Sequence, residues 1–232
     1  MLWGVLTKAD FTKEVKEKTV IIPIGAIEAH GNHLPVNTDS CIVEYLAEKI
    51  AKHTGCIVVP TIYYGPCETM LSFAGTITIS EKISYKIIEE IIKSIICQGF
   101  KQIYILNGHG GNNEFLARIA NKYSKKLNVK TKNWYDLEII NKLKQENTSY
   151  CGDHADRLET EIMLAIDKQK VRMELAVDDM PNWPENTEML TDYSKIMTYA
   201  VEGYPSKSTL KNGKLLLPKV IKSLCEDIGN FL

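Results

Sequence analysis

Residues 24–39 read IGAIEAHGNHLPVNTD, and this stretch joins an apolar run to an amphipathic one. The preceding run, TVIIPIGA at residues 19–26, is short and β-rich, which is typical of a strand in a sheet covered on both faces. After the stretch, apolar residues recur at helical spacing up to Gly55, a natural stop. We expect Asp39 or Ser40 to cap this helix. The sequence therefore predicts a strand, a loop and a crossover helix of an α/β fold.

The same loop is dense in side chains that bind metal ions. Glu28 and His30 are two residues apart, so on extended backbone their side chains point the same way. A proline and an asparagine then favour a turn that would bring Asp39 back over the same spot. The alternative is a polar loop in which His30 and His33 only form local hydrogen bonds. We favour metal binding, because so many ligand-type residues share one short segment.

Further strands and helices alternate along the chain. Apolar patterns predict strands at residues 56–60, 76–80, 102–106 and 129–134, and helices at residues 83–95, 115–123, 136–143 and 158–166. Residues 171–206 are irregular, and we expect them to cap the site or to contact another subunit. Residues 214–232 predict a surface helix that Pro218 starts or interrupts. Since no linker or repeat is visible, residues 1–232 are expected to form a single domain.

Composition excludes several classes of partner. The chain has 232 residues, of which 44% are hydrophobic and 25% charged, as in ordinary globular proteins. Its 28 basic and 29 acidic residues give a formal charge of -1, which provides no field for nucleic acid or an anionic membrane. No apolar run approaches the roughly 20 residues that cross a bilayer. Six cysteines without a C-x-x-C pair are typical of reduced thiols, and so of a cytoplasmic protein.

A second polar loop, NGHGGN at residues 107–112, follows the predicted strand at 102–106. In open α/β sheets the ligand crevice lies outside the carboxyl ends of the strands, so His109 should meet the first loop there. The glycines could instead cradle a phosphate, but the Walker lysine and the G-x-G-x-x-G spacing are missing. We favour a metal-binding His109, with the N–H groups of Gly110 and Gly111 available to a developing oxyanion.

The donor set limits the metal and the mechanism. Carboxylates and imidazoles without thiolates suit zinc, manganese or iron. They are enough for two divalent ions bridged by a carboxylate. A serine hydrolase is a competing mechanism, but no G-x-S-x-G motif is present. A cysteine hydrolase that uses Cys151 beside His154 stays open.

Four segments resemble the signature segments of the creatininase (creatinine amidohydrolase) family. They read IPIGAIEAHGNHLPVNTD, FAGTITI, NGHGGN and GDHADRLET, and they occur in family order across about residues 20–166. The resemblance implies a three-layer α/β/α sandwich with a mixed, largely parallel sheet, a binuclear metal site and a homo-oligomer. Glu28 and His109 match ligands of one metal, and His30 matches a ligand of the other. Asp39 matches the bridge, and His154 matches the catalytic histidine.

The chain also departs from the family pattern. Creatininases carry a glutamate two residues after the metal-binding histidine, where this chain has Gly111. They frame the substrate with tryptophans, whereas Tyr150 stands four residues before His154 here. Creatinine itself is therefore not the expected substrate. We expect Gly110, Gly111 and Tyr150 to contact the substrate.

The missing glutamate leaves the second metal short of ligands. We expect Glu159, five residues after His154, to complete its coordination and to take part in catalysis. The competing role for Glu159 is to orient a ligand or the catalytic histidine. Glu161, two residues further along the helix, is expected to point elsewhere.

The predicted function is that of a metal-dependent amidohydrolase. It would hydrolyse a non-peptide or cyclic amide C–N bond of a small molecule through a metal-bridging hydroxide, with His154 carrying the proton to the leaving nitrogen. One alternative is a non-catalytic sensor or assembly protein that keeps the metal site. Another is a creatininase-like peptidase or deformylase.

Overall fold

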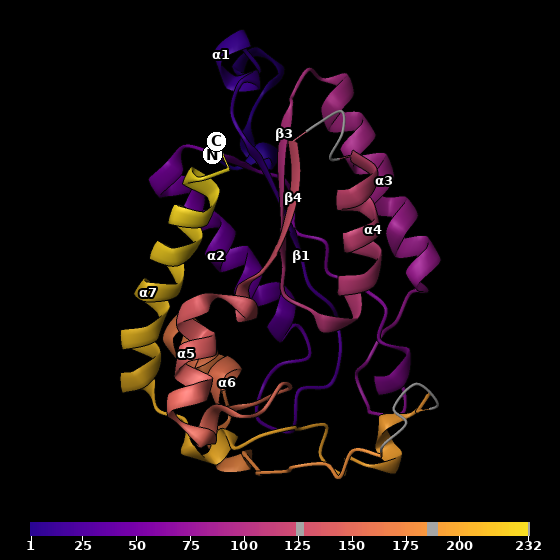
Figure 1. Cartoon of the computed structure of the whole chain (residues 1–232), viewed down its shortest axis with the longest axis vertical. Helices are drawn as coiled ribbons and strands as arrows, with labels where there is room; N and C mark the ends of the chain where they lie inside the picture. The colour runs from indigo at the N-terminus through magenta and orange to yellow at the C-terminus, as the bar shows by residue number, and fades with distance from the viewer. Residues whose placement is uncertain (124–127, 185–189, 232) are drawn as a thin grey trace.

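The computed structural model describes residues 1–123, 128–184 and 190–231. The strands are β1 (Val20–Ile24), β2 (Ile57–Val58), β3 (Gln102–Asn107) and β4 (Asn128–Asn133). The helices are α1 (Lys13–Lys16), α2 (Thr38–Thr54), α3 (Glu81–Cys97), α4 (Asn113–Tyr123), α5 (Glu138–Glu146), α6 (Arg157–Asp167) and α7 (Leu210–Gly229). Strands and helices alternate through the first half of the chain, as the sequence predicts (Figure 1).

The sheet has the strand order β2-β1-β3-β4, and all of its pairs are parallel. Antiparallel pairing among the described residues is confined to isolated bridges, such as that between Ile27 and Ile77. Ile24 pairs with Asn107, so β1 and β3 end at the same level. The loops that follow these two strands therefore leave the sheet side by side, at the place where ligands bind in open α/β folds.

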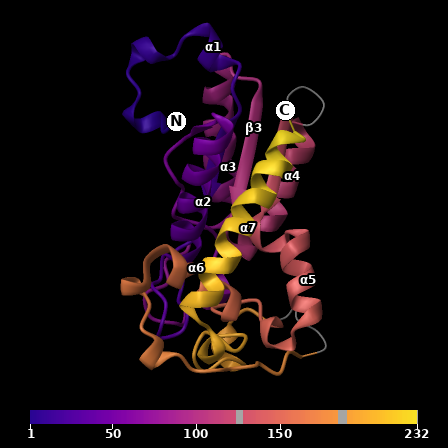
Figure 2. The same ribbon diagram turned by 90° about the vertical axis from the view of Figure 1, so that its left-hand side faces the viewer.

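Helices cover both faces of the sheet. Along β1, Ile21 packs into the core formed with α2, α6 and α7, whereas Val20, Ile22 and Ile24 pack into the core formed with α3 and α4. Figure 1 shows the two groups of helices on opposite sides of the strands, and Figure 2 shows α7 crossing in front of the sheet when one face is viewed. The predicted three-layer α/β/α sandwich is confirmed, and burial on both faces explains why the strands are almost uniformly apolar.

The predicted strand at residues 76–80 is wrong. Ile77 N donates to Ile27 O at 2.9 Å, and Ile79 N donates to Gly65 O at 3.2 Å. These bonds attach the segment to loops at the carboxyl end of the sheet, outside the four-stranded ladder. Its alternating pattern is that of an extended loop, which has the same period of two as a strand.

The predicted cap of α2 is also wrong. The helix begins at Thr38 with Asn37 as its N-cap, so Asp39 lies within the first turn. Ser40 Oγ donates to Ala26 O at 3.1 Å and fastens the turn to the preceding loop. Because Asp39 does not cap the helix, its carboxylate is available to the site.

The C-terminal helix begins earlier than expected. It runs from Leu210 to Gly229, and Pro218 lies inside it and neither starts nor interrupts it. One face is buried, including Leu216, Leu217, Val220 and Leu224, so α7 belongs to a covering layer and is only partly a surface helix. Leu232, the last residue of the prediction, lies outside the described residues. None of the described helices combines the length and apolar character needed to cross a bilayer.

Candidate metal centre

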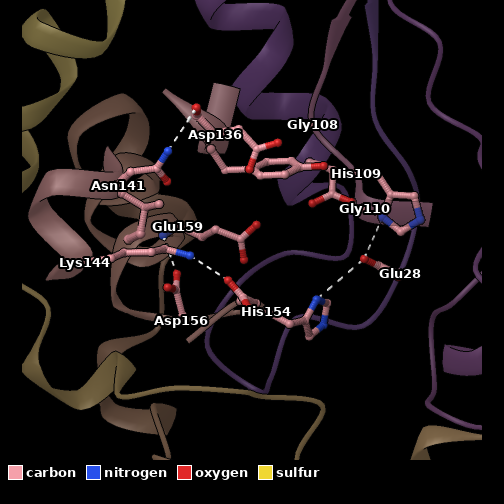
Figure 3. A pocket seen from close by; sticks show the side chains of 14 residues that line it. Glu28, Gly108, His109, Gly110, Asp136, Asn141, Lys144, His154, Asp156 and Glu159 are labelled. Atoms are coloured by element: carbon pink, nitrogen blue, oxygen red, sulfur yellow. Dashed lines mark hydrogen bonds and ion pairs between the residues drawn. The ribbon is translucent and has the colours of Figure 1, made fainter. Parts of the chain in front are cut away.

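The predicted ligands converge at the carboxyl end of the sheet. They come from the loop after β1, the first turn of α2, the loop after β3 and the first turn of α6, and they are Glu28, His30, Asp39, His109 and Glu159. All five are buried, and His154 lies beside them and is partly exposed. Figure 3 shows Glu28, His109, His154 and Glu159 around one cavity.

One group of donors surrounds Nδ1 of His109. This nitrogen lies 3.0 Å from Glu28 Oε1 and 3.0 Å from Asp39 Oδ2. The other ring nitrogen, Nε2, lies 2.8 Å from Pro66 O, which can only accept, so Nε2 carries the proton. Nδ1 therefore presents its lone pair to the carboxylates, as a metal-binding histidine does.

A second group surrounds Nε2 of His30. It lies 3.0 Å from Asp39 Oδ1 and 3.6 Å from Glu159 Oε2. Nδ1 of His30 donates to the Glu28 carbonyl oxygen at 3.0 Å, so Nε2 is the unprotonated nitrogen of the neutral ring. The two oxygens of Asp39 thus face two different groups of donors.

The residues present fit a cation. His30 Nε2 and Asp39 Oδ2 are fully buried and have no hydrogen bond of acceptable geometry to any described residue, although each has a neighbour at 3.0 Å. Lone pairs that face each other across this distance are expected of ligands that share an ion. Three overlapping groups of possible ligands lie here: Glu28, Cys67 and His109; Glu28, His30 and His154; His30, Asp39 and Glu159.

The electrostatics of the site favour bound positive charge. Burial alone would lower the pKa of His30, but the carboxylates of Asp39 and Glu159 raise it well above the usual value. Burial alone would raise the pKa of Asp39, but His30 and His109 hold it below its usual range. The same carboxylates that favour a second proton on His30 would favour a divalent ion in its place.

A hydrogen bond to the backbone and a turn with unusual geometry orient His154. Its Nε2 donates to Ala29 O at 2.8 Å, and its Nδ1 lies 3.6 Å from Glu28 Oε1. Ala155 has φ 47°, a left-handed conformation that costs a non-glycine residue about 1 kcal/mol. In this conformation the Ala155 N–H reaches Glu159 Oε2 at 2.7 Å. The turn therefore fixes His154 and Glu159 together.

Sequence reasoning missed the asparagines that shape the second loop. Asn107 is fully buried, and its side chain donates to His109 O at 2.8 Å and accepts from His109 N at 3.1 Å. Asn112 Nδ2 donates to Gly25 O at 3.1 Å and so joins this loop to the one after β1. The two asparagines that flank the glycines were the available signal.

Cys67 is a second residue that the sequence did not indicate. Its Sγ lies 3.6 Å from His109 Nε2, and burial raises the pKa of its thiol. The thiol lies next to Nε2, which donates to Pro66 O, whereas Asp39 lies next to Nδ1 on the other side of the ring. We therefore leave Cys67 out of the ligand set.

Of the three residues expected to contact the substrate, the two glycines line a cavity and Tyr150 does not. Gly110 and Gly111 line cavities at the centre. A Cβ on Gly111 would lie 2.3 Å from Pro66 O, which excludes a longer side chain in this loop conformation. Tyr150 is only 4% exposed, does not line either cavity, and its hydroxyl donates to Glu161 Oε2 at 2.6 Å. Glu161 points away from the ligands, as expected.

Two cavities adjoin the centre. The larger, of 490 Å³, extends toward α5, and the smaller, of 260 Å³, extends toward the irregular segment. Trp183, Tyr193 and Met197 of that segment line the smaller cavity. The described part of residues 171–206 therefore covers one side of the site, as expected. Residues 185–189 lie outside the described residues. Figure 1 shows the segment running beneath the carboxyl end of the sheet.

The sequence model of one family, described as Creatininase: Creatinine amidohydrolase, matches residues 5–228. The chain belongs to the creatininase family. A 3-dehydro-scyllo-inosose hydrolase of Thermotoga maritima is 32% identical over 77% of this chain and 61% of its own length, so the chain spans less than two thirds of that relative. A creatinine amidohydrolase of Pseudomonas putida is 22% identical over 97% of this chain and 95% of its own.

The creatininase fold is also found among solved structures. A structure described as "Creatininase Mn" superposes with a TM-score of 0.86 at 21% identity, covering 98% of this chain and 96% of the other. At this identity the likeness shows the fold. The creatininase family and its α/β/α fold, both expected from the signature segments, are confirmed.

Proposed function

We propose that this creatininase-family chain is a divalent-metal-dependent amidohydrolase that hydrolyses a non-peptide or cyclic amide C–N bond. The observation that carries the proposal is the position of Asp39, whose Oδ1 lies 3.0 Å from His30 Nε2 and whose Oδ2 lies 3.0 Å from His109 Nδ1. A carboxylate between two groups of donors is the arrangement of a two-metal hydrolytic site. Glu28, Asp39 and His109 would hold one ion, and His30, Asp39 and Glu159 the other.

Bound divalent ions supply Lewis acidity and a nucleophilic water at neutral pH. The protein contributes a buried setting, in which electrostatic interactions with the substrate are stronger than in water. Gly110 lines both cavities and Gly111 lines the smaller one, and their backbone N–H groups are the proposed donors to negative charge on the substrate carbonyl.

His154 is the proposed proton carrier. Because its Nε2–H donates to Ala29 O, the unprotonated atom is Nδ1, which faces Glu28 and lines both cavities with the rest of the ring. Nδ1 can accept a proton from the attacking water and deliver it to the leaving nitrogen.

The proposal extends to the metal, the assembly and the compartment. We propose zinc as the metal, with manganese or iron as alternatives that the same oxygen and nitrogen donors suit. A homo-oligomer is proposed because the Trp- and Pro-bearing segment at residues 180–205 exposes apolar side chains such as Met180 and Tyr199. Six cysteines without a disulfide support a cytoplasmic setting. Sedimentation that shows only monomer at micromolar concentration would refute the oligomer.

The function is tested by turnover. Purified protein would be stripped of metal, reloaded with zinc or manganese, and incubated with cyclic amides, formamides and short peptides. A cyclic ketone belongs in the panel because the Thermotoga relative is named for an inosose. We expect hydrolysis of a cyclic amide or formamide only after reloading. Cleavage of peptides alone would favour a peptidase, and full metal content without any turnover would favour a sensor.

A further inference from the structure

The larger cavity continues beyond the metal centre to a polar wall. Asn141 and Lys144 lie one turn apart on α5 and line it together with Asp136, Asp153 and Asp156. Figure 3 shows Asn141, Lys144 and Asp156 on the side of the cavity opposite His109 and Glu28, with Glu159 between. We call these five residues the α5 wall. None of them belongs to the proposed ligand set.

The α5 wall offers both donors and acceptors. Lys144 Nζ donates to Asp153 Oδ1 at 2.6 Å and to Gly152 O at 3.0 Å, which leaves one of its three N–H groups for a ligand. Asn141 Nδ2 reaches Asp136 O only at 3.5 Å, so its amide is weakly engaged. Hydrogen-bonding groups of the wall therefore remain available to a ligand.

An unpartnered buried oxygen marks the wall as a binding surface. Asp156 is only 2% exposed, and its Oδ1 accepts from Glu159 N at 2.9 Å. Its Oδ2 has no hydrogen-bond partner among the residues that the structure describes. A buried polar atom without a partner costs free energy, which a ligand hydroxyl in the cavity, able to donate or to accept, would recover.

The mixture of groups selects the kind of ligand. The exposed carboxylates of Asp136 and Asp153 stand against one lysine, so the wall repels a carboxylate or a phosphate. A cation would be placed beside the Lys144 ammonium, and an apolar ring would leave the polar groups unpaired. A hydroxyl both donates and accepts, and can meet each member of the wall.

We propose that the α5 wall binds a neutral, hydroxyl-rich part of the substrate while the reacting bond lies at the metal centre. This inference rests on the proposed function for the position of the reacting bond. The binding of the hydroxyl-rich part is independent of which bond is cleaved.

The test is calorimetric binding of myo-inositol, a neutral cyclic polyol, to metal-loaded protein. Two variants remove wall groups: Asn141→Leu, which removes the amide at similar size, and Lys144→Met, which keeps most of the stem. We expect each to weaken binding about tenfold, the loss of roughly one hydrogen bond. Lys142→Met is the matched control, because Lys142 lies on the same helix, pairs with Glu138 and is not part of the wall. It should bind as the wild type does.

Three results would overturn the proposed role of the α5 wall. The first is no polyol binding by the wild type, and the second is tighter binding of inorganic phosphate or guanidinium than of the polyol. The third is binding by the Asn141 and Lys144 variants that equals that of the wild type, which would mean that the polyol contacts only the metals. Amide turnover is measured separately on the same samples. Turnover without wall-dependent polyol binding refutes the wall and leaves the function standing. Wall-dependent binding without any turnover refutes the function and leaves the wall standing.

Discussion

Glu159 Oε2 accepts a hydrogen bond from Ala155 N at 2.7 Å and lies 3.6 Å from His30 Nε2. One carboxylate thus contacts the strained turn that carries His154 and also faces one of the two groups of donors. This position fits a ligand that the turn holds in place, and it unites the two roles that the sequence left open for Glu159.

Replacing Glu159 separates these roles. We predict that Glu159→Gln lowers the occupancy of one metal and nearly eliminates turnover, because an amide is a weaker ligand than a carboxylate. Elemental analysis and steady-state kinetics measure the two effects. Glu174→Gln, an exposed glutamate away from the ligands, is the control. Full metal content in Glu159→Gln, with only activity lost, would assign Glu159 to orientation.

Asp39 and His30 should differ in their effect on stoichiometry. Because Asp39 faces both groups of donors, Asp39→Ala is expected to lose both ions, whereas His30→Ala should lose mainly one. The measurement is metal per chain after equilibration at a fixed free-metal concentration. Two equivalents retained by Asp39→Ala would refute the bridge.

Tyr150 should act through stability. Tyr150→Phe removes the donor to Glu161, which is fully buried and also accepts from Arg157 and Asn212. We predict a fall of about 1 to 3 kcal/mol in the free energy of unfolding, with KM unchanged. A raised KM at unchanged stability would restore the substrate contact expected from the sequence.

His33 should make stability depend on acid. Burial lowers its pKa from 6.5 to about 4. Its Nε2 lies 2.9 Å from Thr160 Oγ1, whose proton goes to Asp156 O, so Nε2 is the donor and Nδ1 has no partner. The unfolded chain takes up a proton that the folded chain refuses, so stability present above about pH 6.5 is lost as pH falls toward 4. The loss is roughly 3 kcal/mol.

Chemical denaturation of chelator-treated protein at several pH values checks this, since metal release then makes no contribution. The slope of the unfolding free energy against pH reports how many protons the chain takes up on unfolding. Between about pH 6.5 and 4 the His33→Gln variant should take up about one proton fewer than the wild type. Equal slopes for the variant and the wild type would show that another group is responsible.

The sequence was sufficient where local pattern and geometry agree. The apolar run of β1, the helical spacing before Gly55 and the ligand-type side chains at the ends of two strands predict the layers and bring Glu28 and His109 together. Periodicity reports which faces are buried, and in a parallel sheet this nearly determines the arrangement of the loops.

The failures arise where a contact depends on how separate parts of the chain pack together. Ile77 alternates as in a strand, but its N–H bonds the Ile27 carbonyl of a loop. Tyr150 stands near His154 in sequence, yet the packing of α6 against α7 buries it on Glu161, where Asn212 also binds. Only the assembled layers determine these contacts.

The bond from Asn112 Nδ2 to Gly25 O has a consequence for biosynthesis. It joins two ligand loops that leave the ribosome 87 residues apart, and Glu159 follows later still. A nascent chain that ends before α6 has emerged carries an incomplete set of donors. With the proposed ligand set, the full metal content would be reached only after α6 has folded, so it would report chains that have finished folding.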